Sequence, residues 1–298
     1  MPELPEVETM RRGILGIVGA KVRGAAALPS PRKPIRMEPA ANELAEAIKG
    51  KKVQAIDRLG KRVVVRLSGD VSLVFEPRMT GLVLVADPPS QEHLRFRLDL
   101  TGCPIRSVYY WDRRGLGSVR LVANDKLAAE LIGNKLGPDA LVISPEELQQ
   151  RLGSSQRAIK VALLDQKAVA GVGNLYASEI LHLAGIHPAK ACRNLKVEDW
   201  QEVHRRLLEV LHLAIEHEGS TLSDGTYRNA LNKAGGYQNQ HRVYDRAGEP
   251  CVQCSTQTII RIVQAQRATF FCPVCQPQKR KLTINPNALV KSRKPKRS

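Results

Sequence analysis

The chain has 298 residues, of which 43% are hydrophobic, and its formal net charge at pH 7 is +17. This length allows two domains with cores of their own, and no apolar run approaches the roughly 20 residues that a membrane-spanning helix needs. Without an apolar signal-peptide core at the N-terminus, the protein is expected to be cytoplasmic. Residues 279–298 contain eight Lys and Arg and no acidic residue, so the rest of the chain keeps a net charge of 17 − 8 = +9.

This charge favours a polyanionic partner, and nucleic acid is the first candidate. Charge alone does not exclude a basic protein that has no such partner. Aromatic residues make up only 4% of the chain, which argues against binding of single strands or RNA on a platform of stacked aromatic rings.

The N-terminal sequence Met-Pro-Glu-Leu-Pro-Glu-Val-Glu places an amine beside carboxylates. Removal of the initiator Met would make Pro2 the N-terminal residue, and an α-amino group titrates near pH 8, so part of it is nucleophilic at neutral pH. Glu3 and Glu6 would share one face at the start of a helix predicted over Val7–Val18, where they could transfer protons. Prolines and acids also suit any helix start, and these residues alone favour that structural interpretation.

Short apolar runs between residues 21 and 122 indicate an antiparallel β-sandwich or barrel. In Leu94–Leu100 every second residue is apolar and the residues between are charged, the pattern of a half-buried strand. One helix is expected near Asn42–Ile48. The other expected strands are Val53–Ile56, Arg62–Leu67, Val71–Phe75, Leu82–Val85, Val108–Trp111 and Ser118–Val122.

From Asn124 onwards the apolar spacing becomes helical, and several of the segments follow Ser, Asp or Asn caps. The expected helices are Leu127–Leu131, Pro145–Leu152, Ile159–Leu164, Leu175–Ala184 and Val197–His217. The basic segment at 279–298 is expected to be disordered and to contact phosphates or remain solvated.

Four cysteines near the C-terminus have the spacing of a zinc site. Cys251 and Cys254 are followed, after 17 residues, by Cys272 and Cys275, as two knuckles around one tetrahedral Zn²⁺ require. Thr258–Val263 and Ala268–Phe271 can form the two strands of a hairpin that turns near Gln266-Arg267. Two disulfides are the alternative, which secretion would favour. Four cysteine ligands leave no open coordination position, so the zinc is expected to be structural. Cys103 and Cys192 are expected to be reduced thiols.

Three segments together resemble the bacterial formamidopyrimidine-DNA glycosylase family. They are Pro-Glu-Leu-Pro-Glu-Val-Glu at the start, Gly-Val-Gly-Asn-Leu-Tyr-Ala-Ser-Glu at 171–179 and the four-cysteine ribbon, and the likeness runs from residue 2 to about 277. The resemblance implies an α+β multidomain enzyme that acts on oxidised purines in double-stranded DNA. Its parts would be an N-terminal β-sandwich at 1–123, a helix-two-turn-helix domain at 124–240, a zinc ribbon at 241–278 and the tail at 279–298. A monomer is expected, since a single active site on one DNA strand does not require symmetry.

The resemblance also implies a glycosylase and lyase mechanism that acts on an everted nucleotide. The nitrogen of Pro2 would attack the sugar carbon C1′ and form a Schiff base, and β,δ-elimination would then cut the strand. Glu3 would manage protons on the ring oxygen and during elimination. Glu6 is similar to a supporting carboxylate, although a purely structural capping role is also open.

The resemblance assigns DNA contacts to residues that, taken singly, could simply be solvated or buried. Lys61 and Arg267 would grip phosphates beside the lesion and assist catalysis, and Met79, Arg114 and Leu116 would fill the space that the everted nucleotide leaves. The further contacts implied are His93, Lys160 and Asn174. Phosphate contacts contribute affinity and register without selecting a lesion.

This chain departs from the family at several positions. Leu116 stands where an aromatic residue is usual, Gly115 replaces an Arg, and Glu76 stands where His is common. The segment Gly219–Gln240 is similar to a loop that covers the everted base, but its sequence is unusual. An enzyme of the endonuclease VIII class, acting on oxidised pyrimidines, and a zinc-ribbon DNA-binding protein without enzymatic activity are the alternatives.

Overall fold

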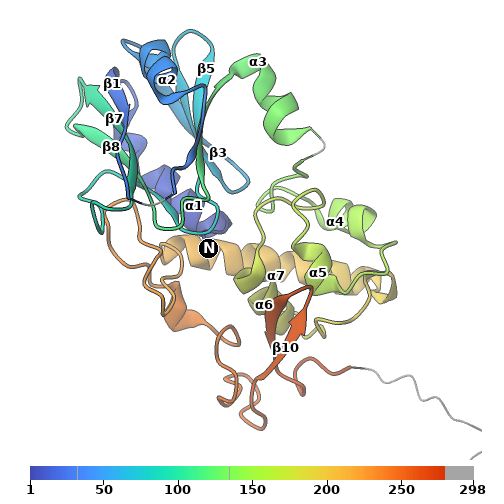
Figure 1. The fold of residues 1–298 in the computed structure, drawn as a ribbon. Helices are drawn as coiled ribbons and strands as arrows, with labels where there is room; N and C mark the ends of the chain where they lie inside the picture. Colours follow the sequence, from blue (N-terminus) through green and yellow to red (C-terminus); the bar gives the residue numbers. More distant parts are fainter. Residues whose placement is uncertain (32, 134, 279–298) are drawn as a thin grey trace, which may run out of the picture.

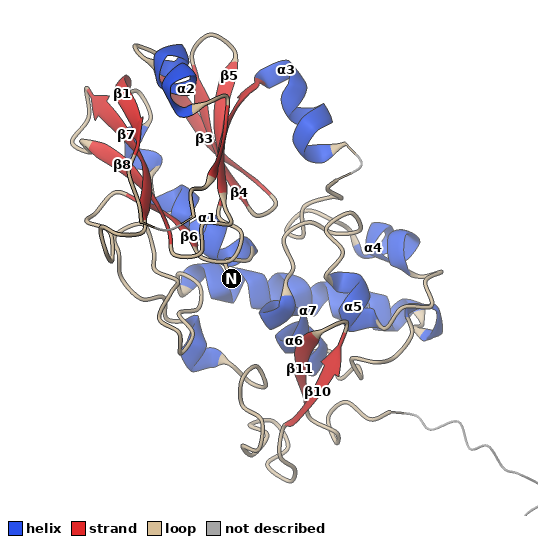
Figure 2. Ribbon diagram, in the orientation of Figure 1, coloured by secondary structure: helices blue, strands red, loops and turns tan. Residues whose placement is uncertain are grey.

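The structure, a computed structural model that describes residues 1–31, 33–133 and 135–278, has two lobes with the N-terminus between them (Figure 1). One lobe holds two β-sheets, and the other is helical with a small β-hairpin at its edge (Figure 2). This confirms the expected α+β architecture. No helix in the described part of the chain is long and apolar enough to cross a membrane. The tail predicted at 279–298 lies outside the described residues.

The first lobe is a sandwich of a four-stranded and a five-stranded sheet. Adjacent strands are antiparallel, except that β2 and β9 run parallel at one edge. Phe75 of one sheet meets Phe96 of the other edge to face, at 6.1 Å between ring centroids, and both are fully buried. The four-stranded sheet has the order β1 (Lys21–Ala27), β7 (Leu94–Thr101), β8 (Ser107–Asp112), β6 (Gly81–Leu84). The five-stranded sheet has the order β2 (Arg36–Glu38), β9 (Ser118–Ala123), β5 (Val71–Glu76), β4 (Arg62–Leu67), β3 (Val53–Leu59).

The seven strands expected from the sequence are all present, but two further strands were missed. β1 reads Lys-Val-Arg-Gly-Ala-Ala-Ala, which is poor in the β-branched residues that signal a strand. It forms because β7 pairs with it, and a register shift lies between Val22 and Gly24. β2 has only three residues and depends on its pairing with β9.

The first helix, α1 (Leu4–Gly13), begins and ends earlier than the predicted Val7–Val18. It begins early because the Glu6 carboxylate accepts the N–H of Glu3, at 2.8 Å, and because proline is tolerated in the first turn. A short 3₁₀ turn, η1 (Leu15–Ile17), follows. Leu4 packs in the helical core, whereas Val7 and Met10 pack in the sandwich core. The helix is therefore held between the two lobes, and this holds the N-terminus between them.

The second lobe follows the helical prediction to within one residue at most boundaries. Its helices are α4 (Pro145–Leu152), α5 (Ile159–Leu163), α6 (Asn174–Leu183) and α7 (Val197–Glu216), with 3₁₀ turns η3 (Cys192–Asn194) and η4 (Tyr237–Gln240). The helix predicted over Leu127–Leu131 is longer, because α3 (Asn124–Leu127) continues through a π turn, η2 (Ala128–Ile132). The helix expected near Asn42–Ile48 is α2 (Ala41–Ile48), which packs on the sandwich.

The C-terminal hairpin pairs β10 (Ile260–Gln264) with β11 (Arg267–Phe271). Its turn is Ala265-Gln266, and both residues have positive φ, at 45° and 59°. The turn lies one residue before Gln266-Arg267, near which it was predicted, because Arg267 pairs with Gln264 as the first residue of β11. The first strand begins at Ile260, two residues later than predicted.

Arg58 joins the two lobes through a nearly buried ion-pair network. Its guanidinium donates to Glu8 of α1 at 3.1 Å, to Asp139 of the helical lobe at 3.0 Å, and to the carbonyl of Gly60 at 3.1 Å. Burial alone would raise the pKa of Glu8. Hydrogen bonds from Arg11 and the neighbouring Arg12, with the charges of Arg11 and Arg58, outweigh it and lower that pKa from 4.5 to about 2.

Replacing Glu8 with Gln should therefore destabilise the protein at neutral pH by on the order of 2 kcal/mol. Because the folded-state pKa is depressed, the ionised Glu8 contributes this stability above its ordinary pKa of 4.5, and the contribution is lost as the pH falls towards 2. Urea denaturation from about pH 7 down to about pH 3.5 would measure it. Exposed Glu46 is the matched control, as Glu46→Gln. A Glu8→Gln deficit that stays constant over this pH range would contradict the prediction.

Candidate active site

Pro2 is buried and lines a cavity of about 320 Å³ between the lobes. Met1 precedes it, lines the same cavity and has 39% of its surface exposed. While Met1 remains, the nitrogen of Pro2 is an amide and cannot act as a nucleophile. The cavity is lined from both lobes and from the hairpin, by Met1, Pro2, Glu3, Glu6, Met79, Thr80, Leu82, Asn174, Leu175, Ser220, Leu222, Asp224, Thr226, Tyr227, Tyr244, Arg267 and Ala268.

Glu3 connects the N-terminal motif to the Gly-Val-Gly-Asn motif. Its Oε1 accepts the backbone N–H of Leu175 at 3.0 Å, in the first turn of α6. A Cβ on Gly173 would lie 2.1 Å from Cδ of Glu3, so only glycine allows the carboxylate to sit there. The second oxygen, Oε2, is buried and has no hydrogen-bond partner among the described residues. A positioned carboxylate with one free oxygen beside Pro2 is suited to proton transfer.

Gly171 allows the N-terminus to approach α6 closely. Its φ is +109°, and a Cβ there would lie 2.4 Å from Cδ1 of Leu4. Its carbonyl also accepts the N–H of Leu4 at 3.1 Å. Two motifs about 170 residues apart in the sequence are thus in direct contact.

Glu6 is fully engaged inside the protein. Oε1 accepts the hydroxyl of Tyr176 and the N–H of Ser220 at 2.9 Å, and Oε2 accepts the N–H of Glu3. Burial raises the pKa of Glu6, and the nearby charge of Glu3 raises it further. These contacts fasten the N-terminus to α6 and to the turn after α7, and they suit a positioning role better than direct proton transfer.

Lys61 lies at the β3–β4 turn, and its ammonium donates to the carbonyl of Val172 at 2.9 Å. Burial lowers the pKa of Lys61; the charges of Glu3 and Glu6 oppose this, and Arg267 adds to it. Lys61 and Arg267 both line a second cavity, which shares Met1 and Arg267 with the first. The structure thus brings Glu3, Glu6, Lys61 and Arg267 together around the N-terminus.

Asn174 and Lys160 attach α6 and α5 to the zinc hairpin. The amide of Asn174 donates to the carbonyl of Ala268 at 3.0 Å, and the ammonium of Lys160 donates to Oδ1 of Asn174 and, at 3.3 Å, to Ala268. Lys160 is fully buried, and burial lowers its pKa to about 8. Both side chains hold Arg267, next to Ala268, at the cavity.

The three side chains predicted to fill the space that an everted nucleotide leaves in the duplex come from two neighbouring loops. Met79 and Leu116 are 39% and 41% exposed, and Arg114 is also exposed, so all three side chains are accessible from solvent. The buried carboxylate of Asp112 connects the loops, because it accepts the hydroxyl of Thr80 and the backbone N–H groups of Arg114, at 3.1 Å, and Gly117, at 2.8 Å. Asp112 has no local signal in the sequence that would predict this role.

The structure shows the local contacts at Gly115 and Glu76, where the chain departs from the family. Gly115 has a φ of +63°, and a Cβ there would lie 2.4 Å from the carbonyl oxygen of Lys33, so a side chain would strain this loop. Glu76 pairs with Arg62 at 3.3 Å and with Arg78 at 3.0 Å beside the second cavity.

His93 lies outside the two cavities around the N-terminus, although its backbone carbonyl accepts the N–H of Asp112 at 2.9 Å. Its ring packs edge to face on Trp111, and its Nε2 is 2.9 Å from the carboxylate of Glu92. It therefore borders the loop of Arg114 and Leu116 and not the Pro2 cavity.

The segment Gly219–Gln240 forms one wall of the first cavity, through Ser220, Leu222, Asp224, Thr226 and Tyr227. The hydroxyl of Ser220 is 2.9 Å from Nε2 of buried His241. Ser220 carries no signal in the sequence that would separate it from an ordinary turn residue.

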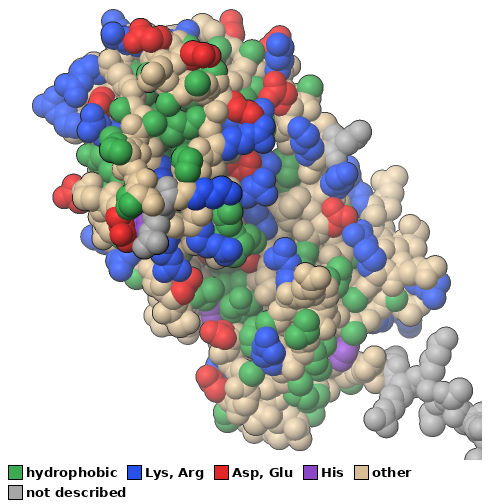
Figure 3. Space-filling view, viewed as in Figure 1, with side chains coloured by type: hydrophobic (Ala, Val, Ile, Leu, Met, Phe, Trp, Pro, Cys, Tyr) green, Lys and Arg blue, Asp and Glu red, His purple; other side chains and the backbone are tan. Residues whose placement is uncertain are grey.

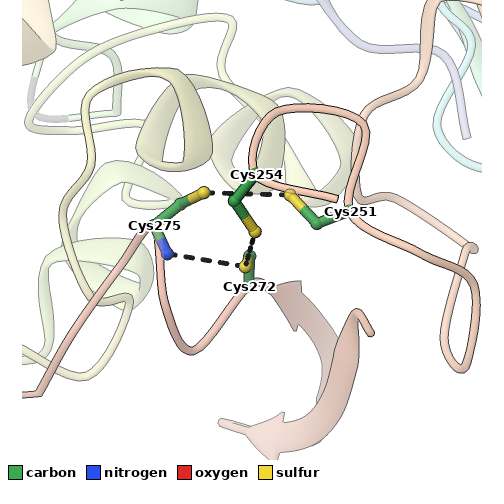
Figure 4. A group of neighbouring side chains, drawn as sticks. All are labelled: Cys251, Cys254, Cys272 and Cys275. Carbon is green, nitrogen blue, oxygen red and sulfur yellow. Dashed lines mark hydrogen bonds between the residues drawn. The ribbon is translucent and has the colours of Figure 1, made fainter. Parts of the chain in front are cut away.

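The four cysteines converge as the sequence predicts. Their sulfur atoms all lie within 4.8 Å of one another, with 3.8 Å between Cys251 and Cys275 and 3.6 Å between Cys254 and Cys272 (Figure 4). Zn–S bonds of about 2.3 Å in a tetrahedron require sulfur separations of about 3.8 Å. The ribbon therefore fits one structural Zn²⁺ held by four cysteines.

Lys and Arg side chains gather over the middle of one face, where the two lobes meet near the N-terminus (Figure 3). Together with the Pro2 cavity and the zinc ribbon, this surface defines a zinc-containing enzyme that acts on nucleic acid. The chain matches the formamidopyrimidine-DNA glycosylase N-terminal domain at residues 1–119, the formamidopyrimidine-DNA glycosylase H2TH domain at 136–226 and a zinc finger found in FPG and IleRS at 248–278. The chain belongs to the formamidopyrimidine-DNA glycosylase family.

Individual relatives cover nearly the whole chain. A formamidopyrimidine-DNA glycosylase of Chloroflexus aurantiacus is 41% identical over 281 residues, which are 93% of this chain and 98% of the relative. The crystal structure of the MutM (Fpg) protein of Thermus thermophilus is 37% identical, with a TM-score of 0.81 over 92% of this chain and 98% of that one. A Lactococcus lactis Fpg mutant in complex with DNA containing Fapy-dG is 33% identical, with a TM-score of 0.81 over 93% and 100% of the two chains.

Proposed function

We propose that this protein excises oxidised purines, including formamidopyrimidines and 8-oxoguanine, from double-stranded DNA and cuts the strand at the abasic site, with Pro2 as nucleophile. The observation that carries the proposal is Oε2 of Glu3, which has no hydrogen-bond partner within residues 1–31, 33–133 and 135–278 and lies beside buried Pro2 in a cavity bordered by Arg267. Support also comes from Lactococcus lactis Fpg, which has been crystallised with DNA containing Fapy-dG and with DNA containing an abasic site.

In the proposed reaction, the free nitrogen of Pro2 forms a bond to C1′ as the bond from C1′ to the base breaks, and the base leaves with the electron pair. The departing base takes a proton from water. Glu3 accepts the proton that the Pro2 nitrogen loses and passes it to the ring oxygen as the bond between C1′ and that oxygen breaks, and the nitrogen lone pair completes an iminium between Pro2 and C1′. The iminium acidifies the proton on C2′. Loss of that proton breaks the bond to the 3′ oxygen, and a second elimination breaks the bond to the 5′ oxygen.

The other residues have supporting roles in this proposal. Glu6 positions Glu3 through the backbone N–H that it accepts. Lys61 and Arg267 supply positive charge for the phosphates on either side of the everted nucleotide. Asn174 and Lys160 hold the hairpin that carries Arg267, and they reach phosphate only if the contacts with Ala268 are exchanged for contacts with DNA.

Met79, Arg114 and Leu116 are proposed to enter the duplex from the two loops that Asp112 connects. Apolar side chains can separate base steps and occupy the position that an everted nucleotide leaves. His93, next to these loops, is proposed to contact the DNA backbone. Leu116 would stack less well on a base than an aromatic ring does.

We further propose that the protein acts as a monomer in the bacterial cytoplasm. The division into parts at 1–123, 124–240, 241–278 and 279–298 also remains a proposal. It is supported by the end of β9 at Ala123 and by family matches that fall within the first three parts.

Comparing cleavage of duplexes that contain 8-oxoguanine, formamidopyrimidine or thymine glycol would test the choice of substrate. We expect the two oxidised purines to be cut at least about 10-fold faster than thymine glycol, which corresponds to a difference of about 1.4 kcal/mol in transition-state binding. The reverse preference would favour the endonuclease VIII alternative. An undamaged duplex is the control and should remain intact.

A further inference from the structure

His182 lies near the end of α6 with its side chain against the zinc ribbon. The residue is fully buried, and its Nε2 is 3.5 Å from Sγ of Cys251. Its Nδ1 is also buried and has no hydrogen-bond partner among the described residues. The mechanism proposed above does not use His182, so this contact needs another explanation.

The position of the ring proton follows from these two environments. A neutral imidazole carries one N–H, and its other nitrogen is an acceptor. A proton on Nδ1 would leave a buried donor without a partner and would direct the lone pair of Nε2 at the sulfur. A proton on Nε2 can be donated to the sulfur of Cys251, and Nδ1 is then a buried acceptor without a partner. An unpaired buried acceptor costs less free energy than an unpaired buried N–H donor.

The zinc site has a use for such a donor. Four thiolates around one Zn²⁺ carry two more negative charges than the metal neutralises, and this cluster lies against the protein interior. Hydrogen bonds to the sulfurs disperse that charge and orient the ligands. The backbone N–H of Cys275 faces Sγ of Cys272 at 3.5 Å, which is a contact inside the ribbon, whereas His182 comes from a different element.

We propose that His182 is a positioning residue for the zinc centre and donates its Nε2–H to the Cys251 thiolate. In doing so it retains the metal and fastens the ribbon to the C-terminal end of α6. At the other end of this ten-residue helix, the side-chain amide of Asn174 donates a hydrogen bond to the carbonyl of Ala268 in the same ribbon, and the backbone N–H of Leu175 donates one to the carboxylate of Glu3. The zinc ribbon and the carboxylate beside Pro2 are therefore fastened to one rigid helix.

Release of zinc from the full-length zinc-loaded protein to a chromogenic chelator would test this proposal without any DNA substrate. His182→Phe keeps an aromatic ring and removes the N–H, and we expect it to release zinc about 10- to 100-fold faster than the parent protein. His182→Gln keeps an N–H donor and should stay within about threefold of the parent. Equal release from the parent and His182→Phe, or release from His182→Gln as fast as from His182→Phe, would overturn the proposal.

The tautomer of His182 can also be measured in the unsubstituted protein, which does not depend on whether a variant folds. The ¹⁵N chemical shifts of the His182 ring distinguish the two neutral tautomers in the zinc-loaded protein. We expect the Nε2–H tautomer, and with ¹¹³Cd in place of zinc we expect scalar coupling from that proton to the metal through Cys251. An Nδ1–H tautomer would overturn the proposal.

Discussion

A protein with any residue left in front of Pro2 should lose both glycosylase and lyase activity, by about 10³-fold or more, the scale seen when a nucleophile is removed. The reason is chemical, because an amide nitrogen has no lone pair available for attack on C1′. Met1 is among the residues that line the Pro2 cavity.

The sharpest form of this experiment uses one preparation before and after processing. A leader that ends in a protease site directly before Pro2 gives a blocked protein, and its removal should restore activity and a borohydride-trapped adduct with DNA through residue 2. Binding to a duplex with a non-cleavable abasic analogue should change little, because Lys61 and Arg267 are present in both forms. Equal cleavage of oxidised purine duplexes before and after removal would refute the mechanism, and unchanged biological activity of the blocked protein would favour the non-enzymatic alternative.

Glu3→Gln should have the second large effect, a fall in the rate of base excision of about 10² to 10⁴-fold, the usual contribution of a positioned acid or base. The amide oxygen of Gln can still accept the N–H of Leu175, so the local structure should survive while the proton-transferring group is lost. Single-turnover kinetics on an 8-oxoguanine duplex would measure the change, and zinc content with the urea midpoint would report folding. A rate within about threefold of the parent would remove Glu3 from the mechanism.

Gly173→Ala provides a second test of the same carboxylate without changing it. The new Cβ would lie 2.1 Å from Cδ of Glu3, so the carboxylate must move away from Leu175 and Pro2. We expect a loss of activity comparable to that of Glu3→Gln. Gly24→Ala on β1 is the matched control, because a Cβ there meets no atom within 4 Å and the backbone needs no positive φ. If Gly173→Ala retained activity, Glu3 would not require its observed position.

Several elements could be predicted from local sequence because their signals are local. The helices α4 to α7 are within one residue of the prediction, since apolar spacing and helix caps act over a few residues. The four cysteines were identified from spacing alone, because two short knuckles bring the ligands together with little help from the rest of the fold.

Other features depend on contacts between distant segments. β1 is a strand because β7 pairs with it, and α1 begins at Leu4 because Glu6 caps the N–H of Glu3 in a buried setting. Asp112 and Ser220 were missed for the same reason, since their importance comes from loops that meet only in the folded chain.

The order of residues already specifies the chemical groups of this protein: an amine at Pro2, carboxylates at Glu3 and Glu6, a Gly-Val-Gly-Asn turn and four thiols at metal-binding spacing. Long-range packing sets what each group faces. It packs α1 between two cores, and among the described residues it leaves one oxygen of Glu3 without a hydrogen-bond partner while both oxygens of Glu6 are engaged. Residue type and spacing determine which bonds a side chain can form, whereas burial and partner geometry determine which of them it forms.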